Sequence, residues 1–466
     1  MKKYLLPALP LLFAVLSAAT ALKRELWFDE ALTLLNFMLP LSFSEIYLTY
    51  PIPNNQIVFT LLLKIWDCFY FLPQLDMVFF WRLLPLAAAL GMAALLIALR
   101  RKTDDGELYP TVLVLSCLSV SGVFINYATA LRGYSVSWLF AAAALWGLYR
   151  IFNGNSAQGW LIYAASCLLA VGTVPTNLLM LVMAGVYAMP WMQEKFWRDR
   201  RFYAVFGVIL LALIVFYAPI ARQFLATFKL GEGFSGRGGA ILMVLGMYLS
   251  VFGLPLLLAP WGISLKERRN ILRWLLWLMP IATILILHRA PFPRVFVPVL
   301  PILAMTVIDG VRAVINSKWR NFHRTVYFIT VICFQILMIP TGFAVAEYAQ
   351  LSRYEDDFFH PWYMLPRYQV SDTARQLTRF PADQTIFASF NSDPMPIIFY
   401  LLQQNDPPLK NFHSDLPFNS VKNLPGNSIV ILRKDEDPAA CGKRFNGTLD
   451  LIHQTRSHNI FRFRKM

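Results

Sequence analysis

The sequence predicts an α-helical protein that crosses a membrane many times and carries a small α/β domain outside the membrane. The first observation is composition: 57% of the 466 residues are hydrophobic and 15% are charged, which is far too apolar for a soluble globular protein. The second is a series of apolar windows of about 15 to 25 residues, the length that crosses a bilayer as a helix. The third is an abrupt change to polar, proline-rich sequence from Glu347 onward.

The apolar windows predict about eleven membrane-spanning helices. They cover residues 4–22, 77–99, 108–125, 134–149, 160–174, 177–190, 202–220, 240–261, 274–287, 295–311 and 325–344. The two windows on either side of residues 173–177 are short enough to form a re-entrant hairpin instead. Removing both leaves the two ends of the chain on opposite sides of the membrane.

The formal charge of +15 comes from 42 Lys and Arg against 27 Asp and Glu. A basic balance can indicate nucleic-acid binding, but in a multi-pass membrane protein it more often records orientation. If Met1 is cytoplasmic, nearly every second connection is basic, including those with Arg100, Arg273 and Arg312, as the positive-inside rule requires. We therefore predict no nucleic-acid partner and an extracytoplasmic C-terminus.

We divide the chain into a transmembrane domain, residues 1–345, and an extracytoplasmic α/β domain, residues 346–466. The first domain includes an extracytoplasmic loop, residues 23–76, in which "IVFTLLLKIWDCFYFL" predicts a helix lying in the membrane interface. In the second domain, residues 371–380 and "MPIIFYLLQ" predict helices, whereas "TIFASF", "SIVILRK" and "NIFRFRK" predict strands.

Four groups of polar residues fall on the predicted extracytoplasmic side. They are Glu25, Asp29 and Glu30 in "ELWFDEALTLL"; Asn54, Asn55 and Gln56 in "YPIPNNQ"; Asn126, Arg132 and Tyr134 in "NYATALRGYS"; and His288, Arg289 and Arg294 in "HRAPFPR". A carboxylate and arginines at membrane level suit catalysis on a phosphorylated lipid. The carboxylate would take a proton from an acceptor hydroxyl, and the arginines would stabilise the departing phosphate.

Each group also has a structural interpretation. Asp29 and Glu30 fit the first turn of a helix through "ALTLLNF", where carboxylates cap free N–H groups. Asn54 and Asn55 follow a proline and are common turn formers, and interfacial arginines often extend to lipid headgroups. The occurrence of all four groups on one predicted side favours a shared site.

Five stretches resemble GT-C glycosyltransferases in their order along the chain. They are "LWFDEALT", "PNNQIVFTLLLKIW", "WRLLPLAAALGMAALL", "ALRGYSVSWLFAAAALWGLY" and "PFPRVFVPVLPIL". They are most similar to the bacterial branch of dolichyl-phosphate-mannose–protein mannosyltransferase-like and RgtA/B/C/D-like enzymes, which is related to the lipid A aminoarabinose transferase. The resemblance covers residues 1–345, which makes this region the expected catalytic domain.

The resemblance implies an inverting transfer of a sugar from a polyprenyl-phosphate donor to a lipid, glycan or protein acceptor. The reaction would take place at the periplasmic face of a bacterial inner membrane, among membrane lipids and without a nucleotide sugar. By the same resemblance, Asp29 matches the family's catalytic acid position and Glu30 its neighbour. The "RGY" of Arg132 and Tyr134 matches a family motif, as does the "PR" of Arg294.

We predict that Asp29, with Glu30 beside it, is the general base or orients the acceptor. The donor phosphate is assigned to Arg132, Arg294, Arg289 and Tyr134, and the acceptor or sugar to Asn54, Asn55, Gln56 and His288. Gln56 departs from the family, in which histidine commonly follows "NN". An amide neither titrates at neutral pH nor binds metals strongly, so roles of that kind are in question at this position.

The sequence identifies no certain cofactor and leaves a divalent cation as an alternative, because one carboxylate pair is a weak basis for a metal site. Two other functions stay open. One is a ligase or polymerase that joins lipid-linked oligosaccharides, and the other is a transporter or lipid-binding protein. A transporter should carry its polar residues at mid-membrane depth in broken helices, whereas this chain concentrates them at one interface.

Overall fold

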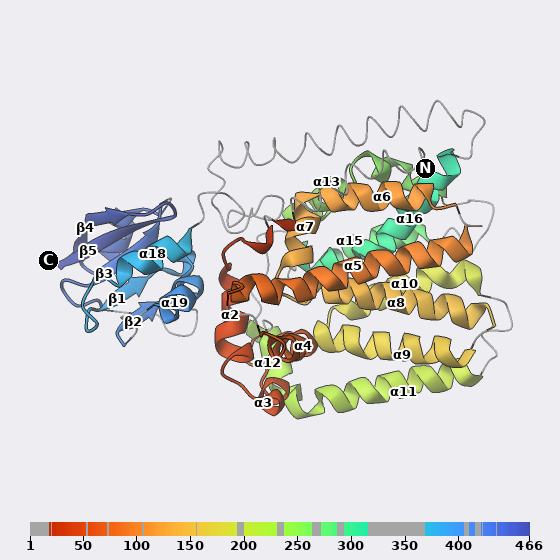
Figure 1. Cartoon of the computed structure of the whole chain (residues 1–466), viewed down its shortest axis with the longest axis horizontal. Helices are drawn as coiled ribbons and strands as arrows, with labels where there is room; N and C mark the ends of the chain where they lie inside the picture. Colours follow the sequence, from red (N-terminus) through yellow and green to blue (C-terminus); the bar gives the residue numbers. More distant parts are fainter. Residues whose placement is uncertain are drawn as a thin grey trace. The chain divides into compact units, whose positions relative to one another are not determined.

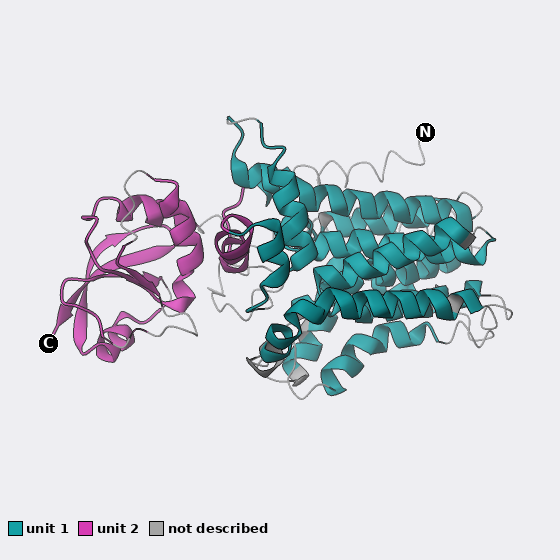
Figure 2. Cartoon of the chain, turned by 90° about the horizontal axis from the view of Figure 1, so that it is seen from below, with its two compact units in different colours: residues 1–22, 41–344 teal, residues 23–40, 345–466 magenta. Residues whose placement is uncertain are grey.

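The computed structural model describes residues 18–19, 21–52, 55–71, 74–104, 107–154, 156–192, 200–230, 237–262, 272–286, 293–315, 369–404, 410–414, 421, 423–434 and 436–466 (Figure 1). The chain divides into two compact units (Figure 2). Unit 1 comprises residues 1–22 and 41–344, and unit 2 comprises residues 23–40 and 345–466.

Unit 1 is built of helices. Its α-helices are α3 (Phe43–Leu48), α4 (Ile57–Asp67), α5 (Met77–Thr103), α6 (Tyr109–Val120), α7 (Gly122–Thr129), α8 (Tyr134–Phe152), α9 (Ser156–Thr173), α10 (Asn177–Ala188), α11 (Arg200–Tyr217), α12 (Ala221–Leu230), α13 (Arg237–Phe252), α15 (Trp274–Ile286) and α16 (Leu300–Ile315). Short 3-10 helices are η2 (Met189–Trp191), η4 (Ala218–Ile220), η5 (Leu254–Gly262) and η6 (Pro293–Val299). Helices α5, α8, α9 and α11 run side by side (Figure 1).

The helices of unit 1 are those of a multi-pass membrane protein. Within the described residues, four segments are long and apolar enough to cross a bilayer: Met77–Thr103, Tyr134–Phe152, Tyr203–Ala226 and Arg294–Val314. Two bent helix pairs raise this number to six if each pair is one span. The prediction of many apolar spans is confirmed at this level, but the number eleven is not. The window 325–344 and most of the window 4–22 lie outside the described residues.

Two predicted spans bend sharply for local reasons. Between α6 and α7 the chain turns by 79°, because Ser121 leaves the helical conformation and its hydroxyl accepts a hydrogen bond from the N–H of Phe124. Between α13 and η5 the turn is 105°. There Gly253 adopts a φ of 59°, which a residue with a side chain rarely takes.

A buried ionic network joins α5 to α16 and to the residue that precedes α15. It uses basic residues that the charge pattern assigned to cytoplasmic connections. The pairs are Arg100 with Asp309 (2.7 Å) and Asp104 (2.7 Å), Arg273 with Asp309 (3.0 Å), and Arg312 with Asp104 (2.6 Å). Tyr187 of α10 adds a hydrogen bond to Asp309 at 2.9 Å. These arginines therefore fix helix packing in addition to any role in orientation.

Unit 2 contains a five-stranded sheet in the order β2-β1-β3-β5-β4, which confirms the predicted small α/β fold. The strands are β1 (Ile386–Ala388), β2 (Phe412–Ser414), β3 (Ile429–Arg433), β4 (Gly447–Gln454) and β5 (His458–Lys465). Strand β1 pairs in parallel with β2 and β3, whereas β5 pairs antiparallel with β3 and β4. Phe387, Val430, Leu432, Phe461 and Phe463 are buried together in its core.

The helices of unit 2 come from both ends of the chain. They are α2 (Phe28–Thr33), the π-helix η1 (Leu34–Met38), α18 (Val370–Leu377), η8 (Phe390–Ser392), α19 (Pro394–Leu402) and α20 (Pro438–Arg444). From the sequence we assigned residues 23–76 to one loop of the transmembrane domain. In the structure the compact units divide this loop after Pro40, and its first part groups with the C-terminal residues.

Candidate functional site

The acidic pair occupies the first turn of α2, where a negative charge is stabilised by the free N–H groups of the helix. Both side chains are buried, with Asp29 6% and Glu30 0% exposed. One carboxylate oxygen of Glu30 accepts a hydrogen bond from the N–H of Trp27 at 3.3 Å. The other lies 3.3 Å from the guanidinium of Arg24. Glu30 therefore caps the helix, as its structural interpretation expects, and it also pairs with an arginine.

The backbone of Asp29 takes part in holding α2. The hydroxyl of Thr33 donates to the backbone carbonyl of Asp29 at 2.9 Å, a bond that helps to hold the helix. By the family resemblance Asp29 is the candidate of the pair for chemistry, and the Glu30 side chain binds Trp27 and Arg24. That role stays a prediction.

The chain before the acidic pair is anchored by Glu25 to the start of α18. The carboxylate of Glu25 accepts hydrogen bonds from the N–H of Ser371 at 3.0 Å, from the N–H of Val370 and from the hydroxyl of Ser371. Burial raises the pKa of the Glu25 carboxyl above its usual range, although these hydrogen bonds act in the opposite direction. Glu25 is thus a helix cap supplied from the other end of the sequence.

Two further contacts fix the segment that carries Asp29. The N–H of Leu26 donates to the hydroxyl of Tyr400 on α19 at 3.0 Å. The ring of Phe28 meets that of Phe390 in η8 edge to face, with centroids 5.2 Å apart. Helix α2 also packs against α19. Within unit 2, the C-terminal residues therefore hold the backbone on the N-terminal side of Asp29.

In unit 1 the structure brings together two of the predicted motifs, "NNQ" and "RGY". The side-chain oxygen of Gln56 accepts a hydrogen bond from the N–H of Gly133, a residue 77 positions later. A Cβ atom at Gly133 would lie 2.3 Å from Thr173 and 3.0 Å from the Gln56 oxygen, so the site requires glycine. The Gln56 side chain thus has a structural role that an amide can fill without gaining or losing a proton.

Arg132 lies immediately before this glycine and is buried, with 4% of its surface exposed. Burial raises the pKa of Tyr50 to about 12, and the positive charge of Arg132 opposes this shift. Arg132 also precedes the N-terminus of α8, the positive end of a 19-residue helix. The guanidinium and the helix terminus together favour a negatively charged ligand.

Of the three other residues predicted to bind the donor, the structure describes Tyr134 and Arg294. Tyr134 is buried at the start of α8, and its ring meets that of Tyr127 at 4.8 Å. Arg294 is half-buried in η6. That segment is held on α8 because the indole N–H of Trp138 donates to the carbonyl of Val297 at 2.8 Å. The remaining residue, Arg289, lies outside the described residues.

Of the predicted acceptor-binding residues, Asn55 is buried and has a structural role. Its side-chain nitrogen donates to the carbonyls of Ile46 at 2.9 Å and of Thr49 at 2.5 Å, which holds the connection from α3 to α4. This agrees with its interpretation as a turn former. Asn54 and His288 lie outside the described residues.

Sequence reasoning missed Gly133, Tyr50 and Tyr400 as parts of these clusters. For Gly133 a signal was present, because a glycine between Arg132 and Tyr134 at a predicted helix start indicates close backbone contact. Nothing in the local sequence links Tyr400 to Leu26, or the Tyr50 phenol to the charge of Arg132, because both relationships depend on the fold.

A metal site was left open by the sequence. Among the residues that the structure describes, no three His, Cys, Asp or Glu side chains are grouped so that they could hold a metal ion. Asp29 and Glu30 are adjacent carboxylates, but the contact of Glu30 with Arg24 already supplies a positive charge there.

Comparison with solved structures gives an informative similarity. No family model matches the chain, and no curated protein matches it. Among solved structures, the crystal structure of ArnT from Cupriavidus metallidurans in the apo state is similar over 98% of this chain and 97% of that chain. The TM-score is 0.60 and the sequence identity is 12%. The chain therefore has a GT-C glycosyltransferase fold, and the similarity extends over nearly its whole length.

Proposed function

We propose that this chain is an inverting membrane glycosyltransferase of the bacterial inner membrane. It would transfer a sugar from a polyprenyl-phosphate donor to a lipid, glycan or protein acceptor at the periplasmic face. The GT-C fold and the apolar helices support this class of reaction. The observation that carries the proposal is Arg132, buried before the N-terminus of α8 and next to the Gly133 that is bonded to Gln56.

Arg132 and the N-terminus of α8 would bind the donor phosphate. As the bond from the sugar to the phosphate breaks, negative charge grows on the departing oxygen. A fixed, permanently charged guanidinium stabilises that charge without reorganisation. Arg294 would add a second guanidinium from η6, which is itself held against α8. Tyr134, in the first turn of α8, would orient the phosphate through its hydroxyl.

Asp29 would act on the acceptor. Its carboxylate would take the proton of the acceptor hydroxyl while that oxygen forms a bond to the anomeric carbon of the donor sugar. The bond from this carbon to the phosphate breaks on the opposite face, so the anomeric configuration inverts. Glu30 would keep the first turn of α2 in place through Trp27 and Arg24. Polyprenyl phosphate and the glycosylated acceptor are the products.

The most direct test of this class of reaction is the lipid content of cells. A strain that lacks the protein should accumulate one polyprenyl-phosphate sugar, detected by mass spectrometry of the lipid extract. The wild-type protein should remove this accumulation, and the Arg222→Lys variant, which changes an exposed arginine of α12, should do the same. If no polyprenyl-phosphate sugar accumulates, the proposed donor is wrong.

A further inference from the structure

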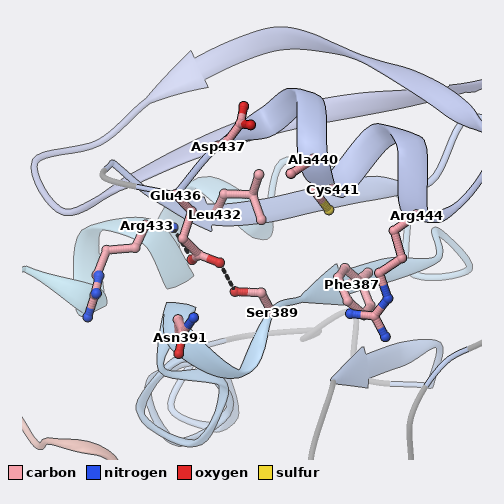
Figure 3. A pocket seen from close by; sticks show the side chains of 10 residues that line it. All are labelled: Phe387, Ser389, Asn391, Leu432, Arg433, Glu436, Asp437, Ala440, Cys441 and Arg444. Carbon is pink, nitrogen blue, oxygen red and sulfur yellow. Dashed lines mark hydrogen bonds between the residues drawn. The ribbon is translucent and has the colours of Figure 1, made fainter. Parts of the chain in front are cut away.

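A hollow of about 470 Å³ opens in unit 2 where two parallel strands end (Figure 3). Ser389 follows β1, and Arg433 is the last residue of β3, its parallel neighbour. In open α/β sheets, ligands bind beyond the carboxyl ends of the parallel strands, where the connecting loops diverge. The volume lies within the range of small-molecule sites. The hollow therefore has the position and size of a ligand site.

A carboxylate inside the hollow is held in one orientation. The hydroxyl of Ser389 donates to one oxygen of Glu436 at 2.5 Å, and the hydroxyl of Ser392 donates to the other. The backbone N–H of Arg433 donates to that second oxygen at 2.9 Å. A carboxylate can accept about four hydrogen bonds. The protein supplies three of them to Glu436, which leaves about one position for a hydroxyl of a ligand. Glu436 is thus a preorganised hydrogen-bond acceptor.

The segment with Ser389 and Ser392, which binds the Glu436 carboxylate, is held in place by a buried histidine. The Nε2 atom of His458 lies 3.1 Å from the carbonyl of Ser392, and a carbonyl only accepts, so Nε2 carries the proton. The Nδ1 atom lies within hydrogen-bond distance of the hydroxyls of Ser457 at 2.9 Å and Thr373 at 3.1 Å. His458 is 0% exposed. The loop that holds Glu436 is therefore tied to α18 and β5.

The lining of the hollow mixes charges of both signs. Arg433 and Arg444 lie on opposite sides of it, and Glu436 and Asp437 belong to the turn between β3 and α20 (Figure 3). Two arginines and two carboxylates sum to no net charge. Such a lining disfavours a free anion or a free cation, because each would meet a like charge as well as an opposite one.

A neutral sugar matches this lining. Each hydroxyl of a sugar both donates and accepts, so it can bond to a carboxylate and to a guanidinium or the amide of Asn391. The C–H faces of a sugar ring suit the apolar part of the hollow, to which Phe387 and Leu432 contribute. Asn391 and Arg444 are exposed at the rim, so a ligand can reach the hollow from solvent.

We propose that this hollow binds a neutral sugar unit of the acceptor, which makes the acceptor a glycan or a glycolipid. This inference rests on the proposed transferase function and names its acceptor class. The element η8 links the two sites within unit 2: Asn391 lines the hollow, and the neighbouring Phe390 packs against Phe28, one residue before Asp29. The unit that positions the acidic segment would thus also hold the acceptor.

The test measures sugar binding directly, without donor, on the full chain in lipid nanodiscs. The probes are neutral trisaccharides of glucose, galactose, mannose and N-acetylglucosamine, and inorganic phosphate serves as the anionic probe. Binding is measured by saturation-transfer NMR and by calorimetry. At least one trisaccharide should bind saturably. Arg444→Ala and Asn391→Ala should each weaken it about tenfold, the effect of losing one good hydrogen bond to a ligand. The control Lys443→Ala, an exposed neighbour on α20, should bind like the wild type.

Three results would overturn the inference: no trisaccharide binds saturably, both rim variants bind as well as the wild type, or phosphate binds more tightly than every trisaccharide. The Asp29→Asn variant separates this inference from the proposed function. It should bind the trisaccharide normally while losing transfer. If the wild type binds the sugar but transfers nothing, the hollow is a sugar site and the proposed reaction is wrong.

Discussion

Glu25 accepts a hydrogen bond from the backbone N–H of Ser371, 346 residues later in the chain, at 3.0 Å. This contact joins the segment that carries Asp29 to the first turn of α18. The tyrosine hydroxyl of Tyr400 and the ring of Phe390 add two more contacts from the C-terminal residues. The C-terminal part of the chain is therefore a scaffold for the acidic segment.

The Glu25→Ala variant should lose activity although Glu25 takes no part in the chemistry. Without its cap contacts the backbone before Asp29 is less well fixed, and a misplacement of about 1 Å can cost up to about a hundredfold in rate. Glycosyl transfer in reconstituted vesicles measures this. The matched control is Glu45→Ala, since Glu45 also caps a helix, α3, through the N–H of Ser42, but belongs to unit 1. If both variants transfer equally well, the scaffold role fails.

Gly133→Ala should destabilise unit 1. The new methyl group would lie 2.3 Å from Thr173, and relieving such overpacking costs about 1 to 3 kcal/mol. Thermal unfolding in detergent should show a lower midpoint. Gly207→Ala is the control, because a Cβ atom at Gly207 meets nothing within 4 Å. Equal midpoints for the two variants would mean that Gly133 is not packed closely against Thr173 and Gln56.

Arg132→Lys should reduce transfer while leaving the fold intact. Lysine keeps the positive charge but loses the planar pair of donors that fits a phosphate. The rate of transfer at saturating donor is the measurement, and Arg222→Lys is the matched control on the exposed side of α12. Unchanged turnover in Arg132→Lys would make Arg132 a structural or headgroup-binding arginine.

Asp309→Asn should weaken the packing of α5 against α16 without a direct effect on chemistry. It removes the carboxylate that pairs with Arg100 and Arg273 and accepts from Tyr187. The cost should approach about 3 kcal/mol, the lower end of the range for broken buried pairs, because the Asp309 side chain is 15% exposed. Thermal unfolding compared with the exposed-site variant Asp383→Asn measures it. Equal stability of the two variants would contradict the network's structural role.

The fold class and several elements could be predicted from the sequence because they depend on local patterns. "TIFASF" contains β1, "SIVILRK" contains β3, and "MPIIFYLLQ" contains most of α19, since alternation and apolar runs have characteristic periods. The bends at Ser121 and Gly253 were missed, although both residues interrupt helices. Apolar length alone does not distinguish a straight span from two bent helices.

The candidate site could be predicted by residue type but not by grouping. The carboxylates and arginines were identified by their chemistry and by the family resemblance. Neither source indicates that Gln56 bonds to Gly133 or that Glu25 caps α18, because these contacts join positions far apart in the chain. The same limit explains why residues 23–40 were assigned to the transmembrane domain, while their contacts group them with the C-terminal residues.

The central claim is that Asp29 is the catalytic carboxylate, and Asp29→Asn tests it most directly. In reconstituted vesicles with the accumulated polyprenyl-phosphate sugar, transfer should fall about a hundredfold to ten-thousandfold, the usual cost of removing a positioned base. Thermal stability should stay near the wild-type value. The Glu30→Gln variant should lose less of the transfer rate, because the Glu30 side chain binds Trp27 and Arg24. Near-normal turnover by Asp29→Asn would contradict the claim and leave the pair as the start of a helix.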